Sequence, residues 1–154
     1  MANPVCEVLL TEAQLNVPEN RVDLAAGARV DFQGIVRGSE DGREIEGIDY
    51  EAHREMAEHQ LKQIAQQAAI EFGLGSVIIH HRIGFVAVGE PSLFTRACSG
   101  HREAAFQASR WIVEELKKKV PIWKRPRFRS NALRRASRPP SRRSGVASSE
   151  GATV

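Results

Sequence analysis

Two segments of the chain repeat largely apolar residues at the spacing of an amphipathic helix. The first lies between residues 53 and 72, and the second between residues 100 and 118. Gly73 follows the first segment, which predicts a left-handed cap, and Ser99 precedes the second, which predicts an N-cap. The two stripes consist of Ala57, Leu61, Ile64, Ala65, Ala68 and Phe72, and of Ala105, Ser109, Ile112, Val113 and Leu116.

Shorter segments alternate apolar and polar residues, or run apolar throughout, as strands do. We expect residues 30–36 and 45–51 to pair as a hairpin around the polar, glycine-containing loop 37–43. Residues 12–27 are typical of a connector with a short helix near its end. Gly84 either bends one strand or separates two. The expected strands are residues 5–11, 30–36, 45–51, 77–84, 85–90 and 92–98.

The order of these segments, with strands before each helix, predicts an α+β domain of one mixed or antiparallel sheet and two main helices. The 154 residues, 42% apolar and 27% charged, suit one globular domain. No apolar run approaches the roughly 20 residues of a membrane span, and the N-terminus lacks a signal-peptide pattern. The two cysteines, Cys6 and Cys98, are too few for a disulfide framework, so we expect a reducing, cytoplasmic setting.

Positive charge is concentrated at the C-terminal end of the chain. The formal net charge is +3, but the residues from Arg125 onward hold eight arginines and one glutamate, so residues 1–124 carry −4. The end of the chain is also rich in Ser, Pro and Ala and lacks periodicity, which is typical of disorder. We therefore assign residues 1–125 to the folded domain and residues 126–154 to a tail that we expect to be disordered.

Residues 116–124 contain the first candidate chemistry. Pro121 ends the second helix, which places Lys117 in the last helical turn and Lys124 on the segment that leaves it. Both lysines are then within reach of one pocket, and apolar surroundings would suit either amine to proton transfer or nucleophilic work. The alternative is that residues 117–119 only complement the negative end of the helix dipole.

His101 and Arg102 fall in the first turn of the second helix, where backbone amides and the helix dipole favour an anion such as phosphate. The alternative is a solvated first turn. Arg37 opens a glycine-rich loop and is either a second anion contact or a loop charge. His80 and His81 have no acid or cysteine partner at metal-ligand spacing, so we expect no metal site.

Several short blocks, taken in order, carry a family resemblance. Together they resemble the large, catalytic subunit of molybdopterin synthase over about residues 28–125. The blocks are FQGIVR (32–37), IDYEA (48–52) with Met56 and Ala57, HRIG (81–84), VGE (88–90), HREAAF (101–106), and Leu116 and Lys117 through VPIWK (120–124).

The resemblance implies a sulfur-transfer reaction. Enzymes of that family convert cyclic pyranopterin monophosphate into molybdopterin, the dithiolene of molybdenum cofactor biosynthesis. The sulfur arrives as a C-terminal thiocarboxylate on a small, ubiquitin-like partner subunit. The implied fold is an α/β hammerhead, and the implied assembly is a heterotetramer with a central homodimer of large subunits. No cofactor or metal is implied for the large subunit itself.

Carried over by position, Lys117 and Lys124 match the family's two catalytic pocket lysines. They would either stabilise charge and move protons, or form a transient covalent link to the partner's tail. The chain departs from the family pattern at Pro126, where the family usually has an acidic residue. The substrate-binding positions implied in this way are Ile35, Val36, Arg37, His101, Arg102, Lys117, Lys124, Arg125 and Pro126.

Two other function classes stay open from the sequence. The arginine-rich tail would allow non-specific, salt-dependent binding of RNA or DNA, although its one aromatic residue is Phe128 and no nucleic-acid-binding module precedes it. Alternatively, the chain would be a non-catalytic scaffold that keeps a partner-binding groove. The presence of both Lys117 and Lys124 favours the enzyme.

Overall fold

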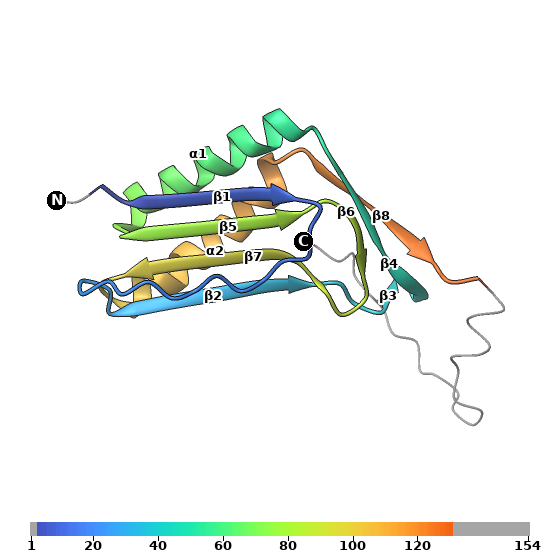
Figure 1. The fold of residues 1–154 in the computed structure, drawn as a ribbon, viewed down its shortest axis with the longest axis horizontal. Helices are drawn as coiled ribbons and strands as arrows, with labels where there is room; N and C mark the ends of the chain where they lie inside the picture. The colour runs from blue at the N-terminus through green and yellow to red at the C-terminus, as the bar shows by residue number, and fades with distance from the viewer. Residues whose placement is uncertain (1–2, 131–154) are drawn as a thin grey trace, which may run out of the picture.

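The computed structural model describes residues 3–130, which form two sheets and two helices (Figure 1). Both helices lie on one face of the larger sheet, and the smaller sheet continues from one end of it. The α+β class with two main helices and a mixed sheet is confirmed. The elements are β1 (Val5–Thr11), β2 (Ala28–Ile35), β3 (Ser39–Glu40), β4 (Arg43–Ala52), α1 (Arg54–Phe72), β5 (Ser76–Arg82), β6 (Gly84–Ala87), β7 (Pro91–Ser99), α2 (Arg102–Lys119) and β8 (Ile122–Phe128).

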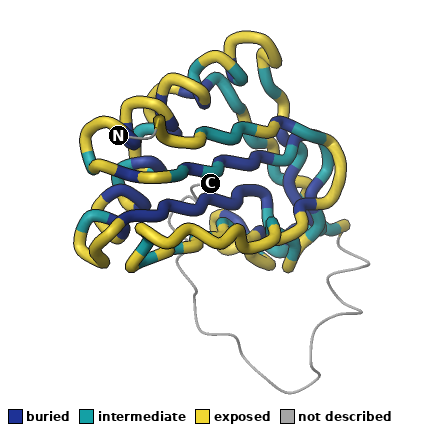
Figure 2. Tube along the Cα trace, turned by 60° about the vertical axis from the view of Figure 1, so that its left-hand side comes forward, coloured by how far each residue is buried: buried dark blue, intermediate teal, exposed yellow. Residues whose placement is uncertain are grey.

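The larger sheet, which we call the main sheet, has the strand order β1-β5-β7-β2. Strands β1 and β5 are parallel, and the other neighbours are antiparallel. Its inner face packs against both helices, and Figure 2 shows that β5 and β7 are buried along most of their length. Leu61 of α1 and Ile112 of α2 are both fully buried in this apolar cluster, together with Val77, Ile79 and Leu93 of the sheet.

Helix α1 forms where its apolar stripe predicts it. Leu61, Ile64 and Ala68 are buried against the main sheet. Gly73 adopts the left-handed conformation, with φ 63° and ψ 44°, and its backbone N–H donates to the carbonyl of Ala69. The predicted glycine cap is therefore confirmed, because a residue with a Cβ would pay a steric penalty at this φ.

Helix α2 begins differently from the prediction. Its N-cap is His101, which makes no side-chain cap hydrogen bond, so the prediction of Ser99 as N-cap is wrong. Ser99 is the last residue of β7, and its hydroxyl accepts a 3.4 Å hydrogen bond from the backbone N–H of His101. At the other end the helix stops at Val120, whose extended backbone precedes Pro121 as proline sterics require.

The smaller sheet has β4 at its centre, with β6 on one side and β8 on the other, and β3 pairs with the start of β4. It has its own group of buried apolar residues, which we call the small apolar cluster: Val36, Ile45, Ile48, Tyr50 and Val86. The expected hairpin between residues 30–36 and 45–51 is wrong, and so is the expectation of a single sheet. Strand β2 instead pairs with β7 along the main sheet, because that partner buries one face of β2 against the helices.

Residues 12–27, which we call the strap, cross the face of the main sheet that the helices leave open (Figure 1). The strap contains a turn at residues 24–25 but no helix, so the short helix expected near its end is wrong. Arg96 holds the strap down: its guanidinium donates to the carbonyls of Pro18 and Glu19 and forms an ion pair with Asp31. Tertiary hydrogen bonds of this kind replace the internal hydrogen bonds that a helix would supply.

Two boundaries were decided by the fold. Gly84, with φ 83°, is the first residue of β6, and β5 and β6 belong to different sheets, so the two-strand alternative is correct. Strand β8 continues to Phe128, past the domain boundary expected at residue 125. The rest of the expected disordered tail, residues 131–154, lies outside the described residues. Among residues 3–130, neither helix is long and apolar enough to cross a membrane.

Candidate functional site

Lys124 lies in β8, and exposure alternates along that strand. Ile122, Lys124 and Pro126 are partly buried on one face, while the residues between them are exposed. The register places Lys124 opposite Tyr50 of β4, which is 4% exposed. Because side chains of paired residues lie on the same face of a sheet, the Lys124 side chain lies beside the small apolar cluster.

The Lys124 ammonium has a carboxylate partner that the sequence analysis missed. Its Nζ donates to Oε1 of Glu40 at 3.2 Å, and the Lys124 and Glu40 side chains are 25% and 6% exposed. Glu40 lies in β3, within the segment that we expected to be a solvated loop. The signal that could have found this strand is the Asp41-Gly42 dipeptide, a common two-residue hairpin turn. Both residues have positive φ, as that turn requires.

Lys117 is exposed on the last turn of α2. Its neighbours Lys118 and Lys119 pair with Glu115, at 3.9 Å and 2.9 Å, and the bond from Lys119 lowers the pKa of that carboxyl. Lys117 makes no ion pair with any residue in the described part of the chain. The dipole-complementing role therefore fits Lys118 and Lys119, and Lys117 is available for another one.

Residues 35–37 connect the main sheet to the smaller sheet. Val36 is 3% exposed in the small apolar cluster, and its backbone N–H donates to the carbonyl of Glu90 at 3.0 Å. Ile35 and Arg37 on either side of it are exposed. This segment thus reaches the small cluster that Lys124 also lines, and it leaves the Arg37 guanidinium at the surface.

Arg125 and Pro126 lie on opposite faces of β8. Arg125 faces away from Lys124, is 74% exposed, and pairs with Glu51 at 3.4 Å. Pro126 shares the face of Lys124 and lies opposite Ile48. Period-two alternation in a strand makes this separation unavoidable. Within one copy of the chain, Pro126 therefore lies beside Lys124, and Arg125 does not.

The start of α2, where His101 and Arg102 lie, is at the opposite end of that helix from Lys117 and from the strand β8, which carries Lys124 (Figure 1). Both are exposed at the start of α2, next to the end of β7. Arg102 and Lys117 are separated by 15 residues of one helix, which corresponds to about 22 Å along its axis. A ligand of the size of a pterin phosphate cannot contact both ends of this helix in the same copy.

A second buried group lies between the two sheets. The Tyr50 hydroxyl donates to the Ser92 hydroxyl at 3.2 Å, and His81 meets the Tyr50 ring edge-on with 5.4 Å between ring centroids. His81 is fully buried, and its Nδ1 bonds the carbonyl of Arg82. Burial lowers the pKa of His81 to about 4, against the opposing effect of that hydrogen bond. His80 faces the other side of β5 and bonds Glu7 at 2.8 Å, because successive side chains of a strand point to opposite faces.

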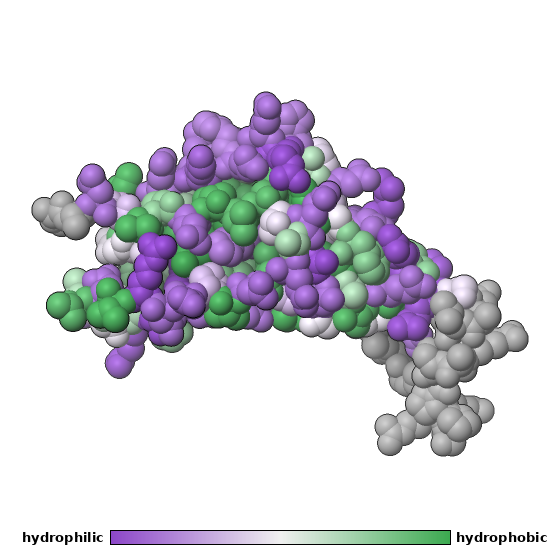
Figure 3. Space-filling view, viewed as in Figure 1, coloured by the Kyte–Doolittle hydropathy of each residue, from purple (hydrophilic) through white to green (hydrophobic). Residues whose placement is uncertain are grey.

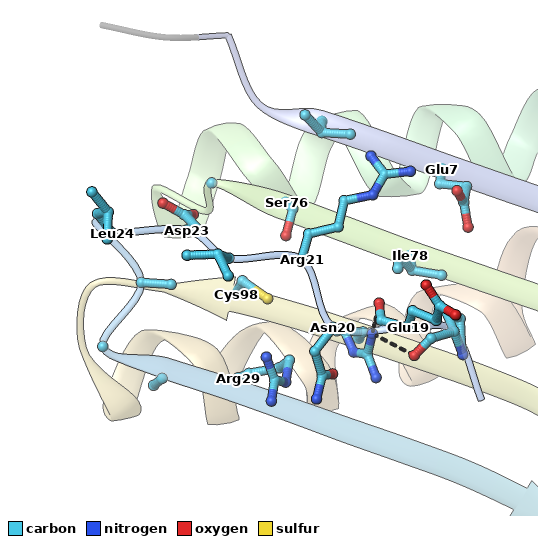
Figure 4. Close-up of a pocket in the computed structure, with 18 residues that line it drawn as sticks. Glu7, Glu19, Asn20, Arg21, Asp23, Leu24, Arg29, Ser76, Ile78 and Cys98 are labelled. Atoms are coloured by element: carbon cyan, nitrogen blue, oxygen red, sulfur yellow. Dashed lines mark hydrogen bonds between the residues drawn. The ribbon is translucent and has the colours of Figure 1, made fainter.

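A depression of about 1050 Å³ lies elsewhere, between the strap and the open face of the main sheet (Figure 4). Charged side chains such as Arg21, Asp23 and Arg29 line it. None of the site residues predicted from the sequence is among its lining residues. Figure 3 shows apolar side chains on the same open face of the molecule, bordered by charged ones. The predicted site and this depression are therefore separate features.

Comparison with known proteins identifies the family. The family model described as MoaE protein matches residues 10–119, well over half of the chain. The chain belongs to the MoaE family. A relative in Thermoplasma volcanium, named molybdopterin synthase catalytic subunit, is 40% identical over 121 residues, which cover 77% of this chain and 88% of the relative. The resemblance inferred from the sequence blocks is confirmed.

Solved structures share the MoaE fold. Molybdopterin synthase from Staphylococcus aureus has a TM-score of 0.71 at 29% identity, covering 81% of this chain and 92% of that chain. A complex of subunits 1 and 2 of molybdopterin-converting factor from Helicobacter pylori has a TM-score of 0.58 at 19% identity, covering 83% and 92% of the two chains. These matches confirm the predicted hammerhead-like fold.

The family model ends at residue 119, so it includes Lys117 and stops before β8. In this MoaE chain, Lys117 lies in the last turn of α2, Lys124 lies in the following strand β8, and Arg37 lies at the junction between the main sheet and the smaller sheet. Cations at such a junction can bind an anion and stabilise an oxyanion that develops during acyl or sulfur transfer. His101 and Arg102, at the start of α2, form a second cationic group, which suits a phosphate.

Proposed function

We propose that this chain is the catalytic subunit of molybdopterin synthase, acting in molybdenum cofactor biosynthesis. It would transfer sulfur from the C-terminal thiocarboxylate of a small subunit to cyclic pyranopterin monophosphate, forming the dithiolene of molybdopterin. The observation that carries the proposal is the position of Lys117 and Lys124 on either side of one helix-to-strand turn in a MoaE chain. Residues 35–37 and Pro126 at the same end supply the substrate-binding wall.

The two lysines would work by charge and by proton transfer. When a sulfur atom replaces an oxygen at a pterin carbon, negative charge develops on the atoms under attack and the departing oxygen needs a proton. A positioned ammonium stabilises the first and supplies the second. A transient covalent link between one lysine and the small subunit's tail is the alternative role, and it requires an unpaired amine, which favours Lys117 over Lys124 for that role.

The partner is a small, ubiquitin-like sulfur-carrier subunit. The complex of two subunits in the Helicobacter pylori structure supports such a partner for a chain with this fold. We place the assembly in the cytoplasm, which agrees with two cysteines that are both free, one of them buried. The partner's extended tail would approach the end of the molecule that carries the lysines.

The distance between the two cationic groups supports a homodimer of this chain within the heterotetramer. About 22 Å of helix separates Arg102 from Lys117, so His101 and Arg102 can act on the same substrate only if they come from a second copy. Complementation tests this. Co-expression of Lys117→Ala and Arg102→Ala chains should restore about one quarter of the wild-type activity, because half of the dimers are mixed and each has one intact site. Activity no higher than in either variant alone would contradict the shared site.

The test of the function is the conversion of cyclic pyranopterin monophosphate by the purified full chain with a thiocarboxylated small subunit. We expect molybdopterin to form, and the rate to fall by about 100-fold or more in Lys117→Ala. Lys118→Ala is the matched control on the same helical turn and should keep the wild-type rate. No product with the small subunit bound would contradict catalysis and favour the scaffold alternative.

The nucleic-acid alternative depends on the arginine-rich residues 131–154, which lie outside the described part of the chain. Deletion of those residues separates the two functions. Binding of RNA or DNA should disappear with them, whereas synthase activity should be retained, since Lys117, Lys124 and residues 35–37 all precede the deletion.

A further inference from the structure

Glu40 is a buried carboxylate, although it belongs to a polar segment that contains glycines. Its side chain is 6% exposed, at the junction of the two sheets. Removing an ionised carboxylate from water is unfavourable by several kcal/mol unless a charge partner and hydrogen bonds compensate for it. A buried carboxylate therefore requires compensating charge or hydrogen bonds from the fold.

Lys124 supplies compensating positive charge, since its Nζ lies 3.2 Å from Oε1 of Glu40. The pair joins β3 to β8, two strands that are separated by more than 80 residues of sequence and are not neighbours in the sheet. Nearby carboxylates on β4 do not share this role: Asp49 pairs with Arg127 at 2.9 Å, and Glu51 pairs with Arg125 at 3.4 Å. Those arginines project from the opposite face of β8.

Tyr50 adds a second constraint on the same face. It lies opposite Lys124 in the strand register and is 4% exposed. Burial raises the pKa of Tyr50, the hydrogen bond with Ser92 opposes that shift, and the negative charge of Glu40 raises the pKa further. The carboxylate of Glu40 is thus close enough to Tyr50 and Lys124 to form one electrostatic group with them.

We infer that Glu40 is a positioning residue that holds the Lys124 ammonium at the junction of the two sheets, so that Lys124 acts as a fixed cation. This rests on the proposed function, in which Lys124 is a catalytic residue. A lysine without the pair would sample the rotamers of its four-carbon stem and point into solvent for part of the time. A fixed ammonium needs no reorganisation when negative charge develops beside it. The role of Lys124 is then electrostatic stabilisation by a cation that is held in place.

The first test measures, without any catalysis, whether the Glu40 carboxylate restrains the Lys124 side chain. The full-length chain, wild type or Glu40→Gln, is treated with a low dose of acetic anhydride, and acetylation of each lysine is followed by mass spectrometry. Lys118, which is 70% exposed, serves as the internal reference. We expect acetylation of Lys124 to become about fivefold faster in Glu40→Gln and to change little in Glu40→Asp, which keeps the charge. Equal rates in the wild type and Glu40→Gln would overturn the inference.

The control for the substitution itself is Asp49→Asn, which removes a carboxylate from the opposite face of the same small sheet. Acetylation of Lys124 should stay at the wild-type rate in Asp49→Asn. Circular dichroism confirms that each variant is folded, and if Glu40→Gln does not fold, Glu40→Ala replaces it in the same comparison with Asp49→Asn, with the same expected rise. A rise in Asp49→Asn as large as in Glu40→Gln would show a general loosening of the sheet and overturn a specific role for Glu40.

The second test uses the complex with the thiocarboxylated small subunit. We expect kcat of Glu40→Gln to fall by roughly 10- to 100-fold with little change in KM for the pterin, because the pair positions a group that acts in the transition state. Glu40→Asp should recover part of the loss. A wild-type kcat in Glu40→Gln would show that the pair is only structural and overturn the inference. If the wild-type complex itself forms no product, the proposed function fails, and the acetylation rates still decide whether Glu40 holds Lys124.

Discussion

The main sheet and the smaller sheet differ in the size of the apolar cluster that each one buries. The main sheet and its two helices enclose a large apolar cluster in which residues such as Leu61 and Ile112 are fully buried. The smaller sheet has only a few buried apolar residues, and beside them it places the Glu40 carboxylate, the Lys124 ammonium and the Tyr50 hydroxyl. The first region supplies most of the hydrophobic stabilisation, and the second holds charges in a defined arrangement.

Buried polar groups occur in both regions: the main sheet buries Arg96 and His81, and the smaller sheet buries Glu40. A buried ion pair rarely stabilises a fold more than apolar residues of the same size would, so its presence is weak evidence for a role in stability. In this chain the buried pair contains a lysine that the family resemblance marks as catalytic.

The largest expected effect on stability comes from a cavity in the main cluster. Leu61→Ala should lower the free energy of unfolding by about 2–5 kcal/mol, because a fully buried leucine is removed from close packing. Chemical denaturation measures this change. The activity per folded molecule should stay at the wild-type level, since Leu61 lies in the main cluster and contacts none of the charged site groups.

Ile48→Ala is the matched change in the smaller sheet, where Ile48 is 2% exposed and lies opposite Pro126. It should lower both the stability and kcat, because it removes a side chain from the face that supports Lys124. Equal kcat values for the folded forms of Ile48→Ala and Leu61→Ala would remove the functional distinction between the two sheets.

A slightly smaller effect is expected from His81, at the junction of the two regions. Its pKa of about 4 in the folded chain is below the ordinary value of 6.5, so the unfolded chain binds more protons between these two pH values. The contribution of His81 to stability is complete above about pH 6.5 and is lost as the pH falls towards 4. The loss amounts to about 3 kcal/mol.

The measurement is the free energy of unfolding at pH 7 and pH 5 for the wild type and for His81→Phe. Phenylalanine fills a similar volume and cannot be protonated, so the variant should lose less stability between the two pH values. An identical pH dependence in both chains would mean that His81 is not held neutral by burial, and the junction would then be more hydrated than its packing indicates.

The smallest expected effect is at the turn that positions Glu40. Gly42 has φ 73°, and an alanine there should lower the stability by about 1–2 kcal/mol, since a Cβ disfavours left-handed backbone. The same variant should speed the acetylation of Lys124, because the turn fixes the strand that carries its partner. Gly42→Asn is the control, since asparagine tolerates this conformation better than alanine. Denaturation and mass spectrometry measure the two effects.

The local features of the fold were readable from the sequence because they depend on neighbouring residues. The stripe of α1 and the glycine cap at Gly73 follow from 3.6-residue periodicity and from the steric freedom of glycine. The turn at Pro121 follows from the missing N–H and the fixed φ of proline. Both lysines were therefore placed correctly on their elements, Lys117 on a last helical turn and Lys124 on the segment after it.

The pairing of strands was not readable, because each strand has several apolar partners of similar quality and the choice depends on total burial. For this reason β2 paired with β7 rather than with β4, and the chain formed two sheets instead of one. The same long-range pairing buried Glu40 and brought it to Lys124, across 84 positions of sequence. No local pattern distinguishes such a glutamate from a solvated one.

The sequence by itself determined the two helices and most of the strands, the family and the identity of the cationic residues, since periodicity and short sequence blocks encode them directly. Only the tertiary structure decided which of those residues meet. It placed Lys124 and residues 35–37 at one end, His101 and Arg102 at the other, and Arg125 on the far face of its strand. The physical reason is that a side chain's neighbours in space are set by sheet register and helix length, which are properties of the packed chain as a whole.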